Sequence, residues 1–117
     1  MTATATASAF ADEVHYLRDL GHLNESQISR AIGVNRSTVG AWLRRQRAPS
    51  GVRAERIAEL SAIVSRASAV MRPEYIPVWL SKPVPALGFE KPMDLVARGD
   101  YRQVAELLGE LETGVHS

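Results

Sequence analysis

The chain has 117 residues, a formal net charge of +1 and no cysteine, with 45% apolar and 23% charged residues. This composition is that of an ordinary soluble globular protein, and it excludes disulfides and thiolate metal sites. No apolar run approaches the ~20 residues that a membrane span requires, and the start, MTATATASAF, lacks the basic and apolar regions of a signal peptide. We therefore expect a cytoplasmic protein with no membrane contact and no metal site.

The positive charge is concentrated in one segment. Residues 1–29 contain four acids and one arginine, a net charge of −3, and residues 57–117 contain eight acids and six basic residues, a net charge of −2. Residues 30–56 contain seven arginines and a single acid, a net charge of +6. Such a segment is typical of a surface that binds nucleic acid. The alternative is a solvated helix face, but that kind of face usually mixes both signs of charge.

Apolar residues recur at helical spacing along the whole chain, and no segment alternates with period two, so we expect an all-α fold. Residues 1–8 are predicted to form a flexible Ala/Thr tail, followed by a first helix over residues 9–20 that Gly21 ends. A second helix is expected to begin at Asn24, which forms a capping-box pair with Gln27.

Residues 27–42, QISRAIGVNRSTVGAW, have the pattern of a helix-turn-helix motif. Gly33 stands where a tight turn between two helices needs a left-handed residue, and Val34 follows as an apolar plug. A third helix begins after Asn35, a good N-cap. Ser29 occupies a position where such motifs usually carry alanine, and serine is small enough to keep the helices in close contact.

The predicted chemistry of this motif is DNA recognition. In a helix-turn-helix the second helix enters the major groove with its N-terminal residues at the base edges. Arg36 suits guanine, and the arginines at the far end of the helix suit phosphates. The candidate DNA-binding residues are Asn35, Arg36, Ser37, Thr38, Ala41, Arg44, Arg45 and Arg47. The alternative is a helix pair of the same shape that contacts only protein. We expect Trp42 to be a core residue rather than a base-stacking ring.

The second half begins with a long helix, expected over residues 52–71, whose apolar stripe is so wide that it must be covered on more than one side. Five prolines then fall between positions 73 and 92 and limit the chain to short helices and turns. We expect a short helix over 75–80, a loop over 82–91 and a short helix over 92–97. A final helix reaches residue 111. Its expected start is an Asp100–Gln103 capping pair, and its inward residues are Val104, Leu107, Leu108 and Leu111.

Together these features resemble the Xre/MbcA/ParS family of antitoxins, the partners of RES-domain toxins. The first half resembles the Xre-type helix-turn-helix through QISRAIGVNRSTVGAWLRRQRAP. The second half carries an ordered set of family motifs: Trp79-Leu80, Leu87-Gly88 in a proline-rich loop, Lys91-Pro92-Met93-Asp94-Leu95-Val96, Gly99 and a closing helix.

The resemblance implies a fold, a function and partners. The implied organisation is a helix-turn-helix region at 9–50, a connecting helix at 51–72 and a toxin-binding domain at 73–117. Family members bind and neutralise an NAD-degrading RES toxin by covering its active site with their C-terminal segment, and many bind their own promoter DNA. Trp79, Leu80, Pro92, Leu95 and Val96 would then build the toxin-binding fold. The blocking surface would consist of Tyr101, Arg102, Glu106, Glu110, Glu112, Gly114, Val115, His116 and Ser117.

Other interpretations stay open at the level of sequence. The three glutamates of the closing helix also suit a solvated face, the last four residues suit a disordered terminus, and Lys82 and Arg98 suit either an interface rim or ordinary surface. No catalytic constellation or cofactor motif is present, so we expect a protein that is not an enzyme and needs no cofactor. The expected partners are the toxin, the operon's promoter DNA and a second copy of the chain, as a homodimer and in a hetero-oligomer with the toxin. Alternatives are a stand-alone helix-turn-helix regulator and a pure protein-interaction module.

Overall fold

The computed structural model describes residues 2–114, with side chains from residue 9 onward. Over this range the chain forms seven α-helices and two short 3₁₀ helices, and no strand beyond an isolated bridge between Val84 and Glu90. The predicted all-α fold class is therefore confirmed. Within the described part, no helix is both long and apolar enough to cross a membrane.

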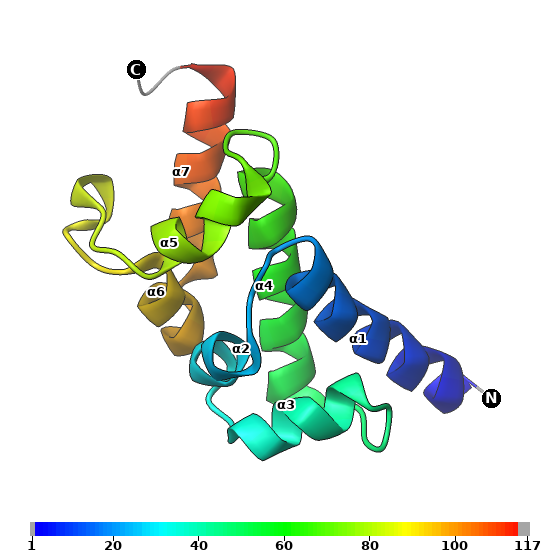
Figure 1. The fold of residues 1–117 in the computed structure, drawn as a ribbon. Helices are drawn as coiled ribbons and strands as arrows, with labels where there is room; N and C mark the ends of the chain where they lie inside the picture. Colours follow the sequence, from blue (N-terminus) through cyan, green and yellow to red (C-terminus); the bar gives the residue numbers. More distant parts are fainter. Residues whose placement is uncertain (1, 115–117) are drawn as a thin grey trace.

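The first four helices contain the helix-turn-helix motif, which consists of the second and third of them (Figure 1). They are α1 (Thr2–Asp19), α2 (Glu25–Ile32), α3 (Arg36–Leu43) and α4 (Gly51–Ala67). Residues 2–8, for which a flexible tail is predicted, continue α1 towards the N-terminus as helical backbone. Alanine at every second position from Ala3 to Ala9 favours a helix there, since alanine has the highest helix propensity.

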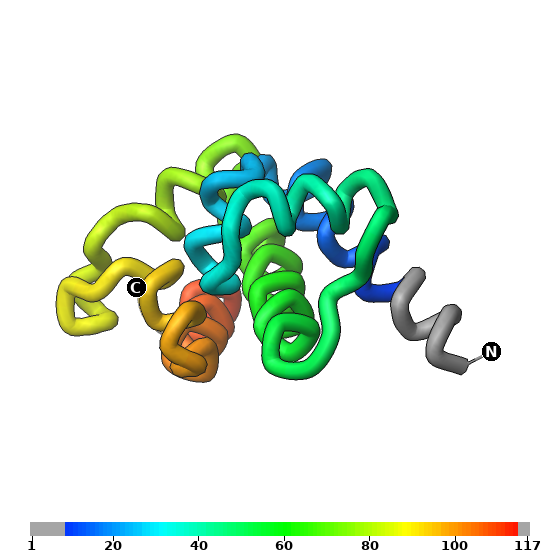
Figure 2. The backbone as a smooth tube through the Cα atoms, turned by 90° about the horizontal axis from the view of Figure 1, so that it is seen from below, coloured from blue at the N-terminus to red at the C-terminus, as the bar shows by residue number. Residues whose placement is uncertain are grey.

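The second half packs on the other side of α4 (Figure 2). Its elements are η1 (Pro73–Tyr75), α5 (Ile76–Leu80), η2 (Pro85–Leu87), α6 (Pro92–Arg98) and α7 (Tyr101–Thr113). The short helices agree with the predicted ones to within two residues at each end. The expected loop over 82–91 contains η2, which begins at a proline as many short helices do.

α4 is the central helix of the molecule. α1 packs along one side of it and α7 along another, and α2 and α6 also contact it. Its residues Ile57, Leu60, Ile63 and Val64 are fully buried in one continuous apolar cluster that runs from α1 to α7. The predicted wide stripe is thus confirmed, and the two halves of the chain share a single core.

α4 ends earlier than expected, at Ala67 rather than at residue 71. After it the chain tightens into a turn in which the backbone N–H groups of Ala69 and Val70 donate to the carbonyls of Arg66 and Ala67. Val70 and Met71 still pack against the core from this turn. Their apolar spacing therefore reflected burial, not helical backbone.

The turn between α1 and α2 corrects another expectation. Gly21 does not end α1 through a left-handed backbone; the left-handed residue is His22, at φ 58°. Gly21 is instead buried, and a Cβ there would lie 2.6 Å from the Leu17 carbonyl oxygen and 3.2 Å from the Val64 methyl groups. Glycine is required for the close approach of this turn to α4.

Candidate nucleic-acid interface and second-half surface

The predicted turn geometry between α2 and α3 is confirmed. Gly33 adopts the left-handed conformation at φ 82°, and its N–H donates to the Ser29 carbonyl. Asn24 and Gln27 form the reciprocal capping box, with bonds of 2.8 and 2.9 Å. Ser29 is buried between the helices, and its hydroxyl donates to the Ser26 carbonyl at 2.8 Å. The serine therefore fits the motif with its polar group satisfied.

The N-terminal turn of α3 presents a polar surface to solvent. Asn35, Arg36 and Ser37 are exposed and Thr38 is half-buried, as a recognition helix requires. Asn35 occupies the N-cap position, but its side chain makes no capping hydrogen bond. Trp42 is 2% exposed and belongs to the core, as expected.

Ala41 was expected to face outward, and this is wrong: it is 7% exposed and packs inward. α3 contacts both α1 and α2, so its buried face is wider than the stripe of Val39 and Trp42 suggested. Gly40 is buried as well, and a Cβ there would lie 3.0 Å from the Arg44 guanidinium. The exposed surface of α3 is accordingly confined to its first turn and its C-terminal end.

Three of the seven arginines between positions 30 and 56 are engaged within the molecule. Arg45 pairs with Asp12 of α1 at 2.6 Å and adopts a left-handed backbone at φ 59°. Arg30 lies 3.7 Å from Asp94 of α6. Arg56 pairs with Glu59 at 3.2 Å and lies over Gly99, where a Cβ would come within 2.8 Å of the guanidinium.

The other four arginines, Arg36, Arg44, Arg47 and Arg53, are exposed and have no acidic partner in the described part of the chain. Arg47 and Arg53 line a shallow pocket of about 230 Å³ with Thr38 and Ser50, between α3 and the start of α4. The candidate set therefore needs one addition, Arg53, which the charge count included but the expected boundary at residue 50 left out.

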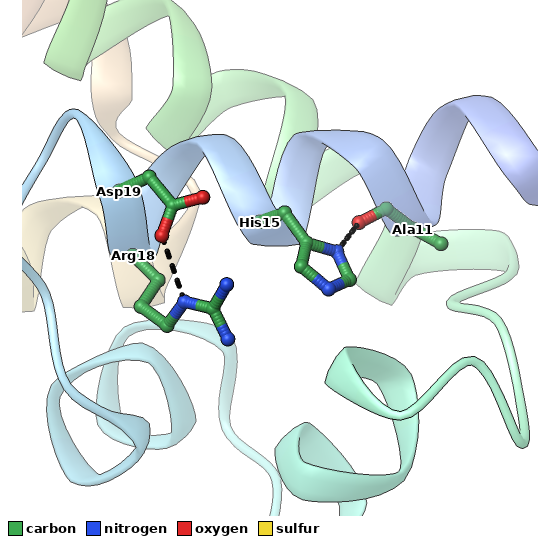
Figure 3. Close-up of polar contacts among 4 residues, drawn as sticks. All are labelled: Ala11, His15, Arg18 and Asp19. Carbon is green, nitrogen blue, oxygen red and sulfur yellow. Dashed lines mark hydrogen bonds and ion pairs between the residues drawn. The ribbon is translucent and has the colours of Figure 1, made fainter.

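α1 adds no unpaired positive charge beside α3. Its basic residue Arg18 donates to Asp19 at 2.9 Å, and this bond raises the pKa of the guanidinium and lowers the pKa of the carboxyl (Figure 3). One turn earlier, Nδ1 of His15 donates to the Ala11 carbonyl at 2.8 Å, along the same helix (Figure 3). On this face of the described structure, the arginines without an acidic partner therefore lie on α3 and in the residues that follow it.

A groove of about 580 Å³ lies between α1 and α4, and Asp12, the partner of Arg45, is one of its lining residues. Glu13 of α1 lines it together with small residues of α4, among them Ala58 and Ser61. One carboxylate oxygen, Oε2 of Glu13, is buried and has no hydrogen-bond partner within the described residues. Burial accordingly raises the pKa of this carboxyl above its ordinary value.

In the second half, the residues that the resemblance assigned to the fold are buried. Trp79 is 7% exposed, Leu95 1% and Val96 0%, and Leu80 and Pro92 are buried too. α7 buries Val104, Leu107 and Leu108 as predicted, but Leu111 is 39% exposed rather than inward. The reason is that α7 extends past the end of the core at its C-terminal turns.

The expected blocking surface is partly accessible. Arg102, Glu106, Glu112 and Gly114 are exposed, whereas Tyr101 and Glu110 are half-buried. Val115, His116 and Ser117 lie outside the described residues. The predicted Asp100 cap is wrong: the Asp100 side chain makes no capping bond, and its ψ of 38° lies outside the extended region that an N-cap adopts.

The proline-rich turn before α6 is held against α7. Ala86 and Leu87 line a shallow pocket of about 260 Å³ with Gln103, Glu106 and Glu110 of α7. Behind the turn, Arg98 donates to Glu90 at 2.7 Å, and this bond lowers the pKa of the Glu90 carboxyl. The sequence left undecided whether Arg98 is an interface residue or an ordinary surface residue. In the structure its guanidinium forms an ion pair within the fold.

Comparison with known proteins agrees with this architecture. Residues 14–60 match the family model HTH_3, described as helix-turn-helix. The MbcA antitoxins ("Mycobacterial cidal antitoxin MbcA") of Mycobacterium tuberculosis and Mycobacterium bovis are 26% identical to the chain over 93 residues, which cover 80% of this chain and 82% of each relative. The crystal structure of the M. tuberculosis MbcT-MbcA toxin-antitoxin complex contains a chain that superposes with a TM-score of 0.81 at 25% identity, covering 90% of this chain and 95% of that one.

The described residues thus form an all-α protein with a helix-turn-helix in its first half. Over most of its length it is also similar in sequence and fold to the MbcA antitoxins, and the resemblance to the Xre/MbcA/ParS type is confirmed. The similarity extends through the second half, where the sequence motifs had indicated it.

Proposed function

We propose that this chain is the antitoxin of a toxin–antitoxin pair. The observation that carries the proposal is the superposition of 90% of the chain on a chain of a toxin–antitoxin complex, at a TM-score of 0.81. Because both halves share one core, the similarity concerns the whole arrangement and not only the widespread helix-turn-helix. Its class of partner is a protein toxin.

The finer mechanism is the one implied by the resemblance. The toxin is a RES-domain enzyme that degrades NAD, and the antitoxin covers its active site with residues 101–117. In support of this, the end of α7 extends beyond the core, with Leu111 and Glu112 exposed. A helix end that makes few contacts of its own can enter a cleft without unfolding the protein.

Co-expression with the toxin tests this proposal. The complex should co-purify, and NAD consumption by the toxin should be inhibited. Deletion of residues 112–117 should restore NAD consumption without lowering the melting temperature, because the described residues of that segment are exposed. The full-length chain at the same concentration is the control. Continued inhibition by the shortened chain would contradict the covering mechanism, and absence of any complex would contradict the antitoxin role.

We further propose that the chain represses its own operon through α3 and the four arginines that have no acidic partner in the described residues. Arg36 would contact base edges, and Arg44, Arg47 and Arg53 would contact phosphates, while Arg45 is held by Asp12. Each phosphate contact lowers the logarithm of the binding constant by about 0.9 per tenfold rise in salt. Residues 73–117 would then serve for toxin binding, and a homodimer would place two recognition helices on two half-sites.

The DNA proposal has a matched charge control. Arg36→Ala and Arg44→Ala should each weaken binding to the upstream DNA, and Arg44→Ala should also reduce the salt slope by about 1. Arg66→Ala removes the same charge from an exposed position near the other end of α4 and should change neither quantity much. An equal loss in all three variants would indicate a nonspecific charge effect. Retained DNA binding with no toxin partner would favour a stand-alone regulator.

A further inference from the structure

Phe89 is the most exposed of the large apolar side chains in the described part of the chain. It is 70% exposed, compared with 61% for Val52, 52% for Val78 and 40% for Tyr75. It lies in the turn between η2 and α6, where its neighbours Val84 and Leu87 are buried. The ring therefore contributes little to the core that holds its own turn in place.

The backbone of Phe89 is also in an unusual conformation. Its φ is 64°, in the left-handed region that a bulky residue rarely adopts and that glycine or asparagine adopts readily. Gly88 just before it is left-handed too, at φ 66°. An exposed aromatic side chain in such a position is unfavourable for the isolated protein on two counts, conformation and hydration.

The turn is nevertheless firmly fixed. The N–H of Phe89 donates to the Val84 carbonyl at 3.0 Å, and the N–H of Val84 donates to the Glu90 carbonyl at 3.1 Å. The side chain of Glu90 is bonded to Arg98 of α6 at 2.7 Å. These contacts fix the backbone of the turn without involving the Phe89 ring. The turn therefore has little conformational freedom to lose when the ring binds a partner.

The position of the turn favours the toxin, rather than DNA, as the partner. The segment 85–90 lies on the side of the molecule opposite to α1, away from the exposed end of α3 (Figures 1 and 2). Ala86 and Leu87 line a common pocket with Glu106 and Glu110, two residues of the proposed toxin-binding surface. Phe89 does not line this pocket, but it is an exposed apolar side chain of the same turn, two positions after Leu87.

We propose that Phe89 is an anchor residue of the toxin interface, whose ring inserts into an apolar pocket of the toxin. The inference rests on the proposed antitoxin function and extends it, since it places binding energy on a fixed turn as well as on the C-terminal segment. Buried aromatic side chains on preorganised surfaces dominate the energetics of many protein interfaces. Loss of such an anchor typically weakens binding by a factor of about 10 or more.

The test uses the full-length chain and its purified toxin. Phe89→Gly and Phe89→Asn both suit a left-handed backbone, so each should leave the melting temperature unchanged or raise it, while the toxin dissociation constant rises at least about 10-fold. Val52→Ala, which shortens an exposed apolar side chain at the start of α4, should leave the dissociation constant unchanged. The combination of equal stability with weaker binding is what a purely structural role would not produce.

The outcomes distinguish a failure of the antitoxin role from a failure of the Phe89 anchor. If the unaltered chain fails to bind the toxin, the proposed function is wrong and the inference fails with it. If the unaltered chain binds and both Phe89 variants bind equally well, the antitoxin role stands and the anchor is refuted. Weaker binding accompanied by a lower melting temperature in both variants would also refute it, because Phe89 would then support the fold.

Discussion

The shared core predicts that truncation of one buried leucine destabilises both halves together. Leu60 of α4 is fully buried in the cluster that joins α1 to α7. Leu60→Ala should lower the free energy of unfolding by about 2–5 kcal/mol, the range for leucine truncation in a packed core. With a urea dependence of about 1.5 kcal/mol/M for a domain of this size, a loss of about 3 kcal/mol lowers the unfolding midpoint by about 2 M.

The chain supplies its own reporters for this experiment, since its two tryptophans lie one in each half. Trp42 is buried in α3 and Trp79 in α5. In a Trp79→Phe background the fluorescence reports on the first half, and in a Trp42→Phe background it reports on the second. In each background, Leu60→Ala should lower the fluorescence midpoint and the circular-dichroism midpoint by the same amount.

A surface truncation provides the control. Leu111→Ala removes the same atoms at a position that is 39% exposed, and should cost less than about 1 kcal/mol because little burial is lost. The reasoning is refuted if Leu60→Ala shifts the signal of one tryptophan and leaves the other at its original midpoint. Two such transitions would mean that the halves unfold independently and that α4 belongs energetically to one of them.

Three further changes test local features of the fold. Asn24→Ala removes the bond that the Asn24 side-chain oxygen accepts from the Gln27 N–H and should cost about 1 kcal/mol in urea unfolding, whereas Asn35→Ala, whose side chain makes no capping bond, should cost less. Gly21→Ala should destabilise more than Gly33→Ala, because the new Cβ at position 21 would lie 2.6 Å from the backbone carbonyl oxygen of Leu17, whereas at position 33 it would meet nothing within 4 Å. The melting temperatures of the two variants give the order, and an equal loss would contradict the clash. For Glu13, burial raises the pKa in the folded state, so the charged form destabilises the fold at neutral pH and stability is regained as pH falls towards the ordinary pKa of 4.5. Glu13→Gln should therefore melt higher than the unaltered chain at pH 7, and the difference should shrink by pH 4; a constant difference would show that ionisation is not its cause.

The features that the sequence predicted well are those decided by neighbours in the chain. The Asn24 cap and the left-handed turn at Gly33 depend on backbone groups within a few residues, and both are confirmed. The buried stripe of α4 follows from helical spacing alone. These signals are local, so no knowledge of the tertiary arrangement was needed to interpret them.

Apart from the local Asp100 cap, which was also predicted wrongly, the main errors concern residues whose environment is set by distant segments. Ala41 is buried on a helix that contacts both α1 and α2, and Leu111 is exposed near the C-terminal end of α7. Arg45 is removed from the free basic set by Asp12, 33 positions earlier in the chain. Periodicity and charge counts describe one element at a time, and they miss how a second element covers a face or neutralises a charge.

The central position of α4 has a consequence for how the protein can be divided. A cut on either side of this helix would leave one fragment without it. In the fragment that keeps the helix, the buried side chains of Ile57, Leu60 and Ile63 would become exposed to solvent. Proteolysis between the halves would therefore yield poorly folded, aggregation-prone pieces rather than two independently folded modules. One such cut would therefore disrupt the helix-turn-helix and the surface of the second half together.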